Sequence, residues 1–363
     1  MTEEIIHIDA GTLESFMKDV FLKVGCPKED AAICAEVLIT SDLRGIESHG
    51  VQRLKMYYDR IKTGVQSPVT KIKILKETPT TARIDVGHGM GHVAGYRAME
   101  MAIKKARQYG TGAVSVGNST HFGIAGYYSM MAIKEGMIGI TVTNARPSIP
   151  PTFGVEPMMG TNPLTIGIPT DEKFPFLIDC ATSITQRGRI EVLSRTESPV
   201  PEGWVIDEHS GIMTDSPKIL EGLSKGTAAL LPLGGLGETL GGHKGYGYAA
   251  AVEILSAALW GGPFMKDLNN PKTYFLGHFL MAINVESFND LKDFRRIAGN
   301  ICRALRNSKK APGQQRIYTA GEKEYYIELE RRKNGIPINK SILRDLLTLK
   351  SELGLSQYKF APD

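Results

Sequence analysis

The sequence predicts an α/β protein whose two ends are helical and whose middle alternates strands with helices. Apolar residues recur at helical spacing through the first 60 residues and again in residues 338–353. Between them, short apolar runs alternate with longer helical patterns, which is typical of α/β folds. We expect residues 1–75 and 285–363 to form one helical lobe and residues 76–284 to form the α/β region.

The predicted helices are marked by their periodicity and by their ends. The second helix opens at Pro27, because proline fits the start of a helix, where the missing N–H is not needed. A third helix is expected from about residue 51 to residue 62, closed by Gly64. Further helices are expected at residues 93–109, 127–135, 247–259 and 338–353, the last with Asn339 as its N-cap.

The predicted strands are short and apolar, which is typical of buried strands. They are expected at residues 81–86, 112–116, 138–143, 176–179, 229–231 and 279–285. Helical patterns separate most of these runs, so the middle of the chain is expected to be α/β.

The composition is that of an ordinary globular protein, with 42% hydrophobic and 23% charged residues. The net charge is +4, and the small basic clusters at 309–310 and 331–333 are expected to face water, so no nucleic-acid partner is predicted. The four cysteines are widely spaced, which indicates free thiols and no metal site. The acidic N-terminus does not resemble a signal peptide, and no long apolar stretch predicts a membrane span, so we expect a cytoplasmic protein.

A glycine cluster at residues 87–95 lies between a predicted strand and a predicted helix, as the dinucleotide-binding fingerprint does. However, its third glycine is displaced by one position. The strand at 112–116 is also followed by Gly117 and Asn118 instead of the acidic residue that would bind a ribose. The cluster therefore favours a tight turn that leads into a helix.

The segment DLRGIESHGVQRL, residues 42–54, gathers several polar side chains between two predicted helices. A histidine such as His49 can exchange a proton near neutral pH, and an arginine such as Arg53 can hold a carboxylate with two hydrogen bonds. If the third helix starts near Gly50, both side chains lie on one face at its N-terminal end. The alternative is that His49 caps a helix or packs in the core.

Other polar segments stand at the ends of predicted strands or helices. Residues 117–128 could present backbone N–H groups to a phosphate, or they could form a polar loop with an N-cap. Asp179 follows a strand, where ligands often bind in α/β proteins, but it could also cap the next turn. Lys244 lies in a glycine-rich loop that enters an apolar helix, a suitable place for an anion.

Together these segments resemble the type-2 malate/L-lactate dehydrogenase family, which includes malate, sulfolactate and ureidoglycolate dehydrogenases. The resemblance rests on DLRGIESHGVQRL, NSTHFGIAGYY, GTNPLTIGIPT, IDCATS with the following RGRI, PEGW and GGHKGYGYA, and with the helical ends it covers nearly the whole chain. It implies an NAD- or NADP-dependent oxidoreductase on a non-Rossmann α/β fold with a mixed sheet. It also implies a homodimer, and we expect the helical lobe to take part in dimerisation.

The resemblance also implies roles for individual residues. It implies that His49 transfers the proton with help from Ser48, that Arg53 binds the substrate carboxylate and that Thr161 lies near the substrate. The cofactor-binding residues it implies are His121, Phe122, Gly123, Ile124, Ala125, Asp179, Cys180, Ala181, Ser183, His243, Lys244, Gly321 and Glu322. Two positions depart from the family pattern: Ala320 replaces the proline of its PGE segment, and His243 replaces an aromatic residue. Some members of the family also have an aspartate that partners the catalytic histidine, and the sequence does not identify such a partner for His49.

The expected reaction is hydride transfer between NAD(P) and a small 2-hydroxy or 2-oxo acid, with malate and oxaloacetate as the first expectation. One alternative is a reductase of another 2-oxo acid, a keto-sugar acid or a cyclic imine. Another is a nucleotide-binding regulator without catalytic activity. Arginines that could bind a second carboxylate or a 2′-phosphate are Arg44, Arg146, Arg187 and Arg189, so the sequence leaves NAD and NADP open.

Overall fold

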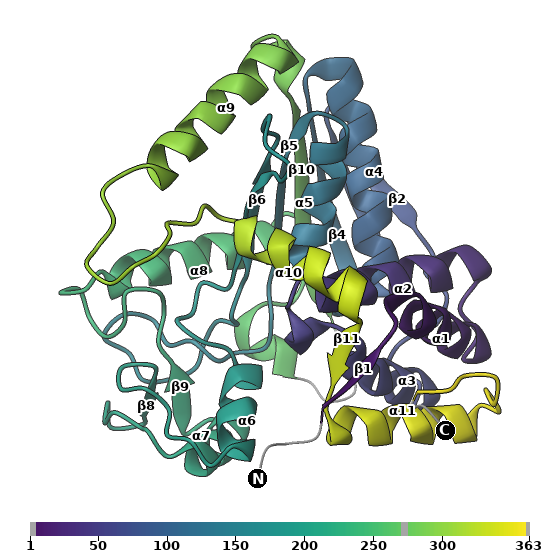
Figure 1. Cartoon of the computed structure of the whole chain (residues 1–363), viewed down its shortest axis with the longest axis vertical. Coiled ribbons are helices and arrows are strands. Elements are labelled where there is room, and N and C mark those ends of the chain that lie inside the picture. Colours follow the sequence, from purple (N-terminus) through teal and green to yellow (C-terminus); the bar gives the residue numbers. More distant parts are fainter. Residues whose placement is uncertain (1–4, 270–274, 361–363) are drawn as a thin grey trace.

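A seven-stranded sheet runs through the centre of the molecule (Figure 1). The computed structural model describes residues 5–269 and 275–360. In spatial order the strands are β2 (Lys73–Glu77), β3 (Thr81–Asp85), β4 (Thr111–Ser119), β10 (Leu276–Asn284), β5 (Met137–Thr143), β6 (Leu164–Ile168) and β7 (Phe176–Cys180). Only β3 and β4 pair in parallel, and the other neighbours in this sheet are antiparallel. The prediction of an α/β protein with a mixed sheet is therefore confirmed.

Two helices cover one face of this sheet. They are α4 (Gly91–Tyr109) and α5 (Ala125–Lys134). Glycines in the strands let the helices approach closely, because a Cβ at Gly112 would lie 2.1 Å from the carbonyl oxygen of Ala102. A Cβ at Gly139 would likewise lie 2.7 Å from the carbonyl oxygen of Ser129 in α5.

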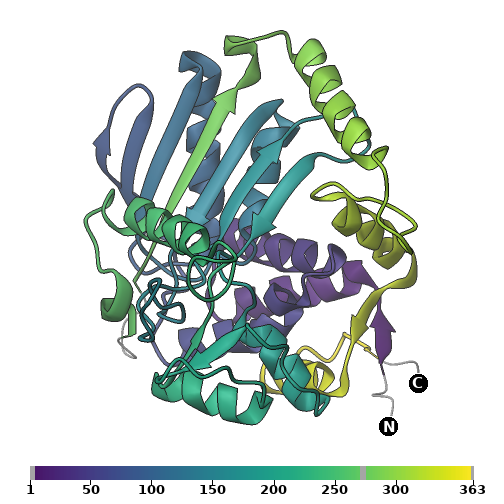
Figure 2. The same ribbon diagram turned by 90° about the vertical axis from the view of Figure 1, so that its left-hand side faces the viewer.

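The other face is covered by a helix at one end only. There α8 (Gly242–Ala257) crosses the strands (Figure 2). The ring of Trp260, just after α8, packs on Gly117. Farther along, no helix of the described residues lies over the strands in this view, and their side chains are partly exposed. These side chains are Ile138, Ile140, Leu164, Ile166, Ile168, Phe176, Ile178, Phe279, Met281 and Ile283, and we call them the open sheet face.

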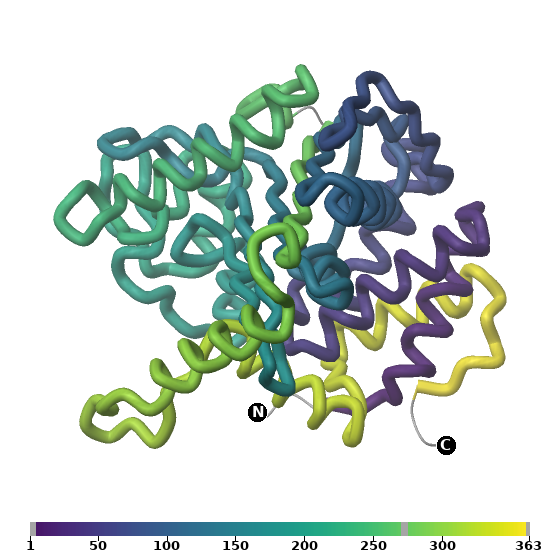
Figure 3. The backbone as a smooth tube through the Cα atoms, turned by 90° about the horizontal axis from the view of Figure 1, so that it is seen from above, coloured from purple at the N-terminus to yellow at the C-terminus, as the bar shows by residue number. Residues whose placement is uncertain are grey.

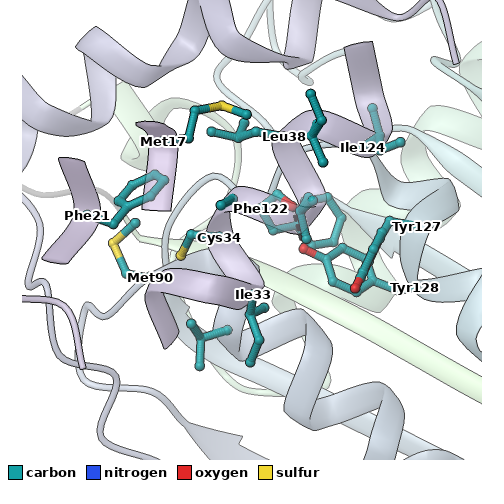
Figure 4. Packing of buried hydrophobic residues seen from close by; sticks show 14 of the residues in the cluster. Met17, Phe21, Ile33, Cys34, Leu38, Met90, Phe122, Ile124, Tyr127 and Tyr128 are labelled. Atoms are coloured by element: carbon teal, nitrogen blue, oxygen red, sulfur yellow. Dashed lines mark hydrogen bonds between the residues drawn. The ribbon is translucent and has the colours of Figure 1, made fainter. Parts of the chain in front are cut away.

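The two ends of the chain lie together beside the sheet. Strand β1 (Ile6–Ile8) pairs antiparallel with β11 (Ile336–Ile338), so residues near the two termini become neighbours. Around this pair lie α1 (Ala10–Lys23), α2 (Lys28–Leu43), α3 (Leu54–Lys62), α10 (Glu322–Asn334) and α11 (Lys340–Glu352). Their apolar faces join α4 and α5 in the largest core (Figure 4), which extends from Phe21 through Leu38 to Tyr128. The division into a terminal lobe and residues 76–284 stays a prediction.

A small unit with its own core lies at the lower left of Figure 1. It contains α6 (Arg187–Arg195), α7 (Ser216–Lys225) and the hairpin of β8 (Val205–Asp207) with β9 (Ala228–Leu230). Ile190 from α6 and Ile219 from α7 pack into this core. A separate helix, α9 (Leu291–Arg306), extends from the body of the molecule (Figure 3) and is tied to the β6–β7 connection by ion pairs from Arg303.

Most predicted elements are confirmed with small shifts at their ends. The third helix differs, because residues 47–53 form two short 3-10 turns, η1 (Glu47–His49) and η2 (Val51–Arg53), and α3 begins at Leu54. The expectation that His49 and Arg53 share one face of a regular helix is therefore wrong. Asn339 caps α11 as expected, since its side chain accepts a hydrogen bond from the N–H of Ile342.

Candidate active site

The turns after α2 carry the polar segment singled out in the sequence. Asp42 lies in the last turn of α2, and its side-chain carboxyl group accepts a hydrogen bond of 2.7 Å from the N–H of Val51. The chain passes so close that a Cβ at Gly50 would lie 1.9 Å from the Asp42 Oδ1. Ser41 also donates to the carbonyl of Ile46 at 2.7 Å. These contacts fold the turns back onto α2 and fix where His49 stands.

Within these turns Ser48, His49 and Arg53 form one connected group. The Ser48 Oγ lies 2.8 Å from His49 Nδ1, and Arg53 Nε donates to the carbonyl of Ser48 at 2.6 Å. Because Ser48 occupies Nδ1, Nε2 of His49 is the nitrogen left for a substrate. The structure therefore places the predicted proton-transfer and carboxylate-binding residues side by side.

A second histidine from a different element faces the first. His121 follows β4, and its ring stacks on His49 with centroids 5.3 Å apart and 24° between the planes. The hydroxyl of Tyr57, from α3, lies 2.5 Å from His121 Nδ1 and fixes the orientation of that ring. Residues predicted separately for proton transfer and for cofactor binding thus meet at one point.

A third histidine lies beneath the other two. His92 from α4 is fully buried, and its ring meets the ring of Tyr57 edge-on at 4.7 Å. Among the described residues, neither ring nitrogen of His92 has a hydrogen-bond partner. Burial alone lowers the pKa of His92 to about 3, because a charged imidazole is costly in an apolar core.

The same physics keeps His49 and His121, the two partly buried members of this cluster, neutral. Burial, together with the nearby Arg53 guanidinium, lowers the pKa of His49 to about 4. Burial and the neighbouring His49 lower the pKa of His121 well below its usual value. At neutral pH both imidazoles are therefore uncharged, which is the form that can accept a proton.

The segment RGRI, which belongs to the resemblance, reaches this group from the small unit. A Cβ added at Gly188, in the first turn of α6, would lie 3.6 Å from the Ser48 Cβ and 3.7 Å from Arg53 Nη2. A longer side chain at Gly188 would therefore press on both residues. The start of α6 therefore lies next to Ser48 and Arg53.

A cavity of about 360 Å³ lies between β7, the end of α2 and the start of α10. Its lining includes three predicted cofactor residues, Asp179, Cys180 and Gly321. Arg44, Lys323 and Glu324 also line it. A cavity of this size suits part of a dinucleotide, since carboxylates can accept bonds from ribose hydroxyls and the cations can face phosphates. The residues present therefore fit the cofactor that the sequence implies.

Asp179 connects this cavity to the segment that carries His121. Its carboxylate accepts hydrogen bonds from the N–H of Gly126 at 2.9 Å and from the Thr165 hydroxyl at 3.1 Å. Burial raises the pKa of Asp179, and the two hydrogen bonds oppose that rise. The start of α5, next to the predicted residues His121 to Ala125, is thereby fixed against β7.

Other predicted residues have roles within the fold. The carboxylate of Glu322 is fully buried and accepts two hydrogen bonds from Thr319. The N–H of Thr319 donates at 3.0 Å and its hydroxyl at 3.2 Å. Glu322 also forms an ion pair with Arg316. Ser183 donates to the carbonyl of Thr185 at 2.6 Å. The carbonyl of Thr161 accepts a bond of 2.9 Å from the N–H of Thr182. Contacts of these residues with a ligand remain a prediction.

Sequence reasoning missed the buried residue that holds the Thr161 turn. Glu253 from α8 accepts a hydrogen bond of 2.8 Å from the Asn162 amide and one of 3.3 Å from the Asn144 amide. Asn162 lies at φ 33°, so this turn depends on its amide contacts. The apolar pattern of α8 gave no signal for a buried acid there.

The structure does not bring every predicted cofactor residue into the 360 Å³ cavity. His243 and Lys244 are exposed in the first turn of α8, away from its lining. Over residues 5–269 and 275–360, no group of three or more His, Cys, Asp or Glu side chains is placed to hold a metal ion. Within the same ranges, no helix has the length and apolar character of a membrane span.

Comparison with known proteins gives a consistent result. The family described as malate/L-lactate dehydrogenase matches residues 8–347. The chain is 46% identical to the malate dehydrogenase of Pyrococcus abyssi, over 97% of this chain and 96% of that protein. It is 40% identical to the L-sulfolactate dehydrogenase of Methanocaldococcus jannaschii, over 93% and 94%. The crystal structure of malate dehydrogenase from Entamoeba histolytica matches with a TM-score of 0.95 at 46% identity, covering 97% of this chain and 99% of that one.

The buried His92 makes acid stability a test of this cluster. The unfolded chain binds a proton on this residue below about pH 6.5, whereas the folded chain does not until about pH 3. Folding therefore loses stability as the pH falls from 6.5, by about 1.4 kcal/mol per pH unit from this group. His92→Leu should reduce that slope between pH 6 and pH 4 in urea unfolding. An unchanged slope would show that His92 titrates alike in both states.

Proposed function

Because the chain belongs to the malate/L-lactate dehydrogenase family, we propose that it transfers a hydride between NAD or NADP and a small 2-hydroxy acid, with malate and oxaloacetate as the substrate pair. The observation that carries this proposal is the connected group of Ser48, His49 and Arg53, which combines a neutral imidazole with a cation for a carboxylate. The similarity to malate dehydrogenases over nearly the full chain supports malate as the acid.

His49 transfers the proton in this proposal. In the oxidation direction, Nδ1–H donates to Ser48 Oγ, and the lone pair on Nε2 accepts the proton of the 2-hydroxy group. In the reduction direction, the doubly protonated ring returns that proton to the carbonyl oxygen. A carboxylate bound at Arg53 offsets the guanidinium charge that helps to lower the pKa of His49, so substrate binding favours the protonated form.

Arg53 orients the acid in this proposal. A guanidinium can bind a carboxylate with two parallel hydrogen bonds, which fixes the direction of the 2-carbon relative to His49. Because Arg53 Nε already donates to Ser48, its terminal nitrogens are the ones offered to the substrate. The carboxylate site and the proton-transfer site are thereby held at a fixed separation.

The cavity beside β7 is the proposed cofactor site. In this proposal Asp179 and Glu324, which line the cavity, would accept hydrogen bonds from ribose hydroxyls, and Arg44 and Lys323 would bind phosphate groups. The bound nicotinamide would accept or supply the hydride. His121, whose ring stacks on that of His49, would help to keep water away from the proton-transfer group.

A second substrate is favoured by one comparison. The 40% identity with an L-sulfolactate dehydrogenase points to an acid that carries a sulfonate where malate carries its second carboxylate. Both acids have the same 2-hydroxycarboxylate end, so His49 and Arg53 would serve either of them. The cations that bind the carboxylate or sulfonate at the far end of the substrate would decide between malate and sulfolactate.

We also propose that the enzyme is a homodimer. The open sheet face is a wide apolar surface, and exposed apolar side chains on α9 lie in line at Ile297, Ile301 and Leu305, which are 46%, 58% and 54% exposed. Apolar patches of this extent are unusual on a monomer and usually mark protein contacts.

A steady-state screen tests the substrate. Oxaloacetate, pyruvate and sulfopyruvate should each be offered with NADH and with NADPH, and we expect the highest kcat/KM with oxaloacetate. A higher value with sulfopyruvate would make sulfolactate the substrate instead. No oxidation of either cofactor with any 2-oxo acid would contradict the proposed reaction.

His49→Ala tests the proton-transfer role. Loss of the imidazole should lower kcat for malate oxidation by roughly 10²–10⁴-fold, because general acid–base catalysis contributes about that much. Cofactor binding, followed by the fluorescence of NADH, should be unchanged. His209→Ala, at an exposed turn, is the control and should keep full activity. A His49→Ala variant with wild-type kcat would move the role to another residue.

Ile301→Glu tests the dimer surface. A charge on the α9 stripe should convert the dimer to a monomer, because an unpaired carboxylate is costly in an apolar interface. Light scattering after size-exclusion chromatography gives the mass of each species. Leu347→Glu, on the exposed side of α11, should leave the mass unchanged. A wild-type monomer at micromolar concentration would refute the dimer, and an unchanged mass for Ile301→Glu would remove α9 from its interface.

A further inference from the structure

One face of α10 is packed on the turns that carry His49. Gly45 follows α2 at φ 76°, and a Cβ there would lie 3.0 Å from the side chain of Ile327. Arg44 forms an ion pair with Glu328 at 3.7 Å, and its side chain is only 6% exposed. Arg331, one turn farther along α10, completes this contact, so a C-terminal helix supports an N-terminal loop.

Arg331 joins two points of the loop with one side chain. It is 9% exposed, and its guanidinium donates to the carbonyl of Asp42 through Nη1 and pairs with the Glu47 carboxylate through Nη2. The Asp42 carbonyl lies in the last turn of α2 and also accepts the N–H of Gly45 at 3.1 Å, so Arg331 adds a charged donor where the helix ends. The planar fork of arginine can serve both groups at once, which a lysine cannot do.

Asp42 then extends the connection to the other end of the loop. Its carbonyl receives Arg331, whereas its buried carboxyl receives the N–H of Val51. The residues between these anchors, 45–50, include Ser48 and His49, and Arg53 follows directly. Burial raises the pKa of Asp42 to about 8, so a neutral hydrogen-bond acceptor serves this position as well as a charged one.

The same helix also borders the proposed cofactor cavity. Gly321, Lys323 and Glu324, at the start of α10, line it, and Arg331 lies in the last turn of the helix. A regular helix of this length is stiff, so its two ends keep their separation. A displacement of α10 would therefore move the loop that carries His49 relative to the cavity.

We propose that Arg331 and Asp42 are positioning residues that clamp residues 45–51, so that His49 and Arg53 reach the substrate together. The catalytic part of this inference rests on the proposed function. The clamp itself is a property of the fold and can be measured without substrate. Misplacement of a reacting group by about 1 Å can cost about 10²-fold in rate, which sets the expected size of the effect.

The test compares Arg331→Met with Lys333→Met, a matched change at an exposed position in the same turn of α10. Arg331→Met should lower kcat for malate oxidation by about 10²-fold while the dissociation constant of NADH changes by less than about twofold. Amide hydrogen exchange of residues 45–53 should become faster, and the pKa of His49, followed by NMR, should rise from about 4 toward 6.5 as the loop opens. Lys333→Met should match the wild type in every measurement.

The partner residue gives an independent arm. Asp42→Ala removes the acceptor for the Val51 N–H and should reproduce the loss of kcat and the faster exchange. Asp42→Asn keeps an oxygen acceptor in a side chain of the same shape, so its kcat and its amide exchange should be close to those of the wild type. If Arg331→Met does not fold, Glu47→Gln, which weakens one arm of the fork, should give a smaller change of the same kind.

Two results overturn the inference. One is an Arg331→Met protein whose exchange and His49 pKa equal those of the wild type, and the other is an Asp42→Asn protein that behaves as Asp42→Ala does. If the wild-type enzyme oxidises none of the acids but Arg331→Met still shows faster amide exchange than the wild type, the clamp is supported and the proposed function is refuted.

Discussion

The contact of the Arg331 guanidinium with the end of α2 is the constraint on which the rest of the site depends. It places a buried charge against the Asp42 carbonyl and the Glu47 carboxylate, so α10 and the loop after α2 cannot move apart without leaving that charge unpaired. The pairing of β1 with β11 brings the two ends of the chain close enough for this contact. The fold thus uses its C-terminal segment to hold a site built mainly by its N-terminal half.

The second determinant of the site is the burial of its imidazoles. The ring of His92 packs on that of Tyr57, and the Tyr57 hydroxyl contacts His121. His121 in turn stacks on His49. In such surroundings protonation is costly, so these rings stay neutral until a negative charge arrives. Binding of the anionic substrate would therefore raise the pKa of His49 and make it an effective acid. Without substrate, His49 would stay unprotonated at neutral pH.

Much of the fold could be predicted from the sequence, because periodicity and end signals are local. The helices around Leu13 and Asn339 follow from such patterns. Prediction was weaker where tertiary contacts decide the outcome. The basic cluster at 331–333 was expected to face water, and this is wrong for Arg331, whose buried partners come from residues far away in the chain. The stacking of His121 on His49 likewise depends on sheet order, which no local motif contains. The family resemblance is confirmed, and it sets aside the regulator without catalytic activity.

The most direct test of the account is a crystal structure of the enzyme with NADH and oxamate, a stable analogue of a 2-oxo acid. The account predicts that His49 Nε2 lies within hydrogen-bond distance of the 2-oxo oxygen, at about 2.6–3.2 Å, and that Arg53 binds the carboxylate through its terminal nitrogens. A complex in which another side chain reaches that oxygen, with His49 more than one water away, would contradict it.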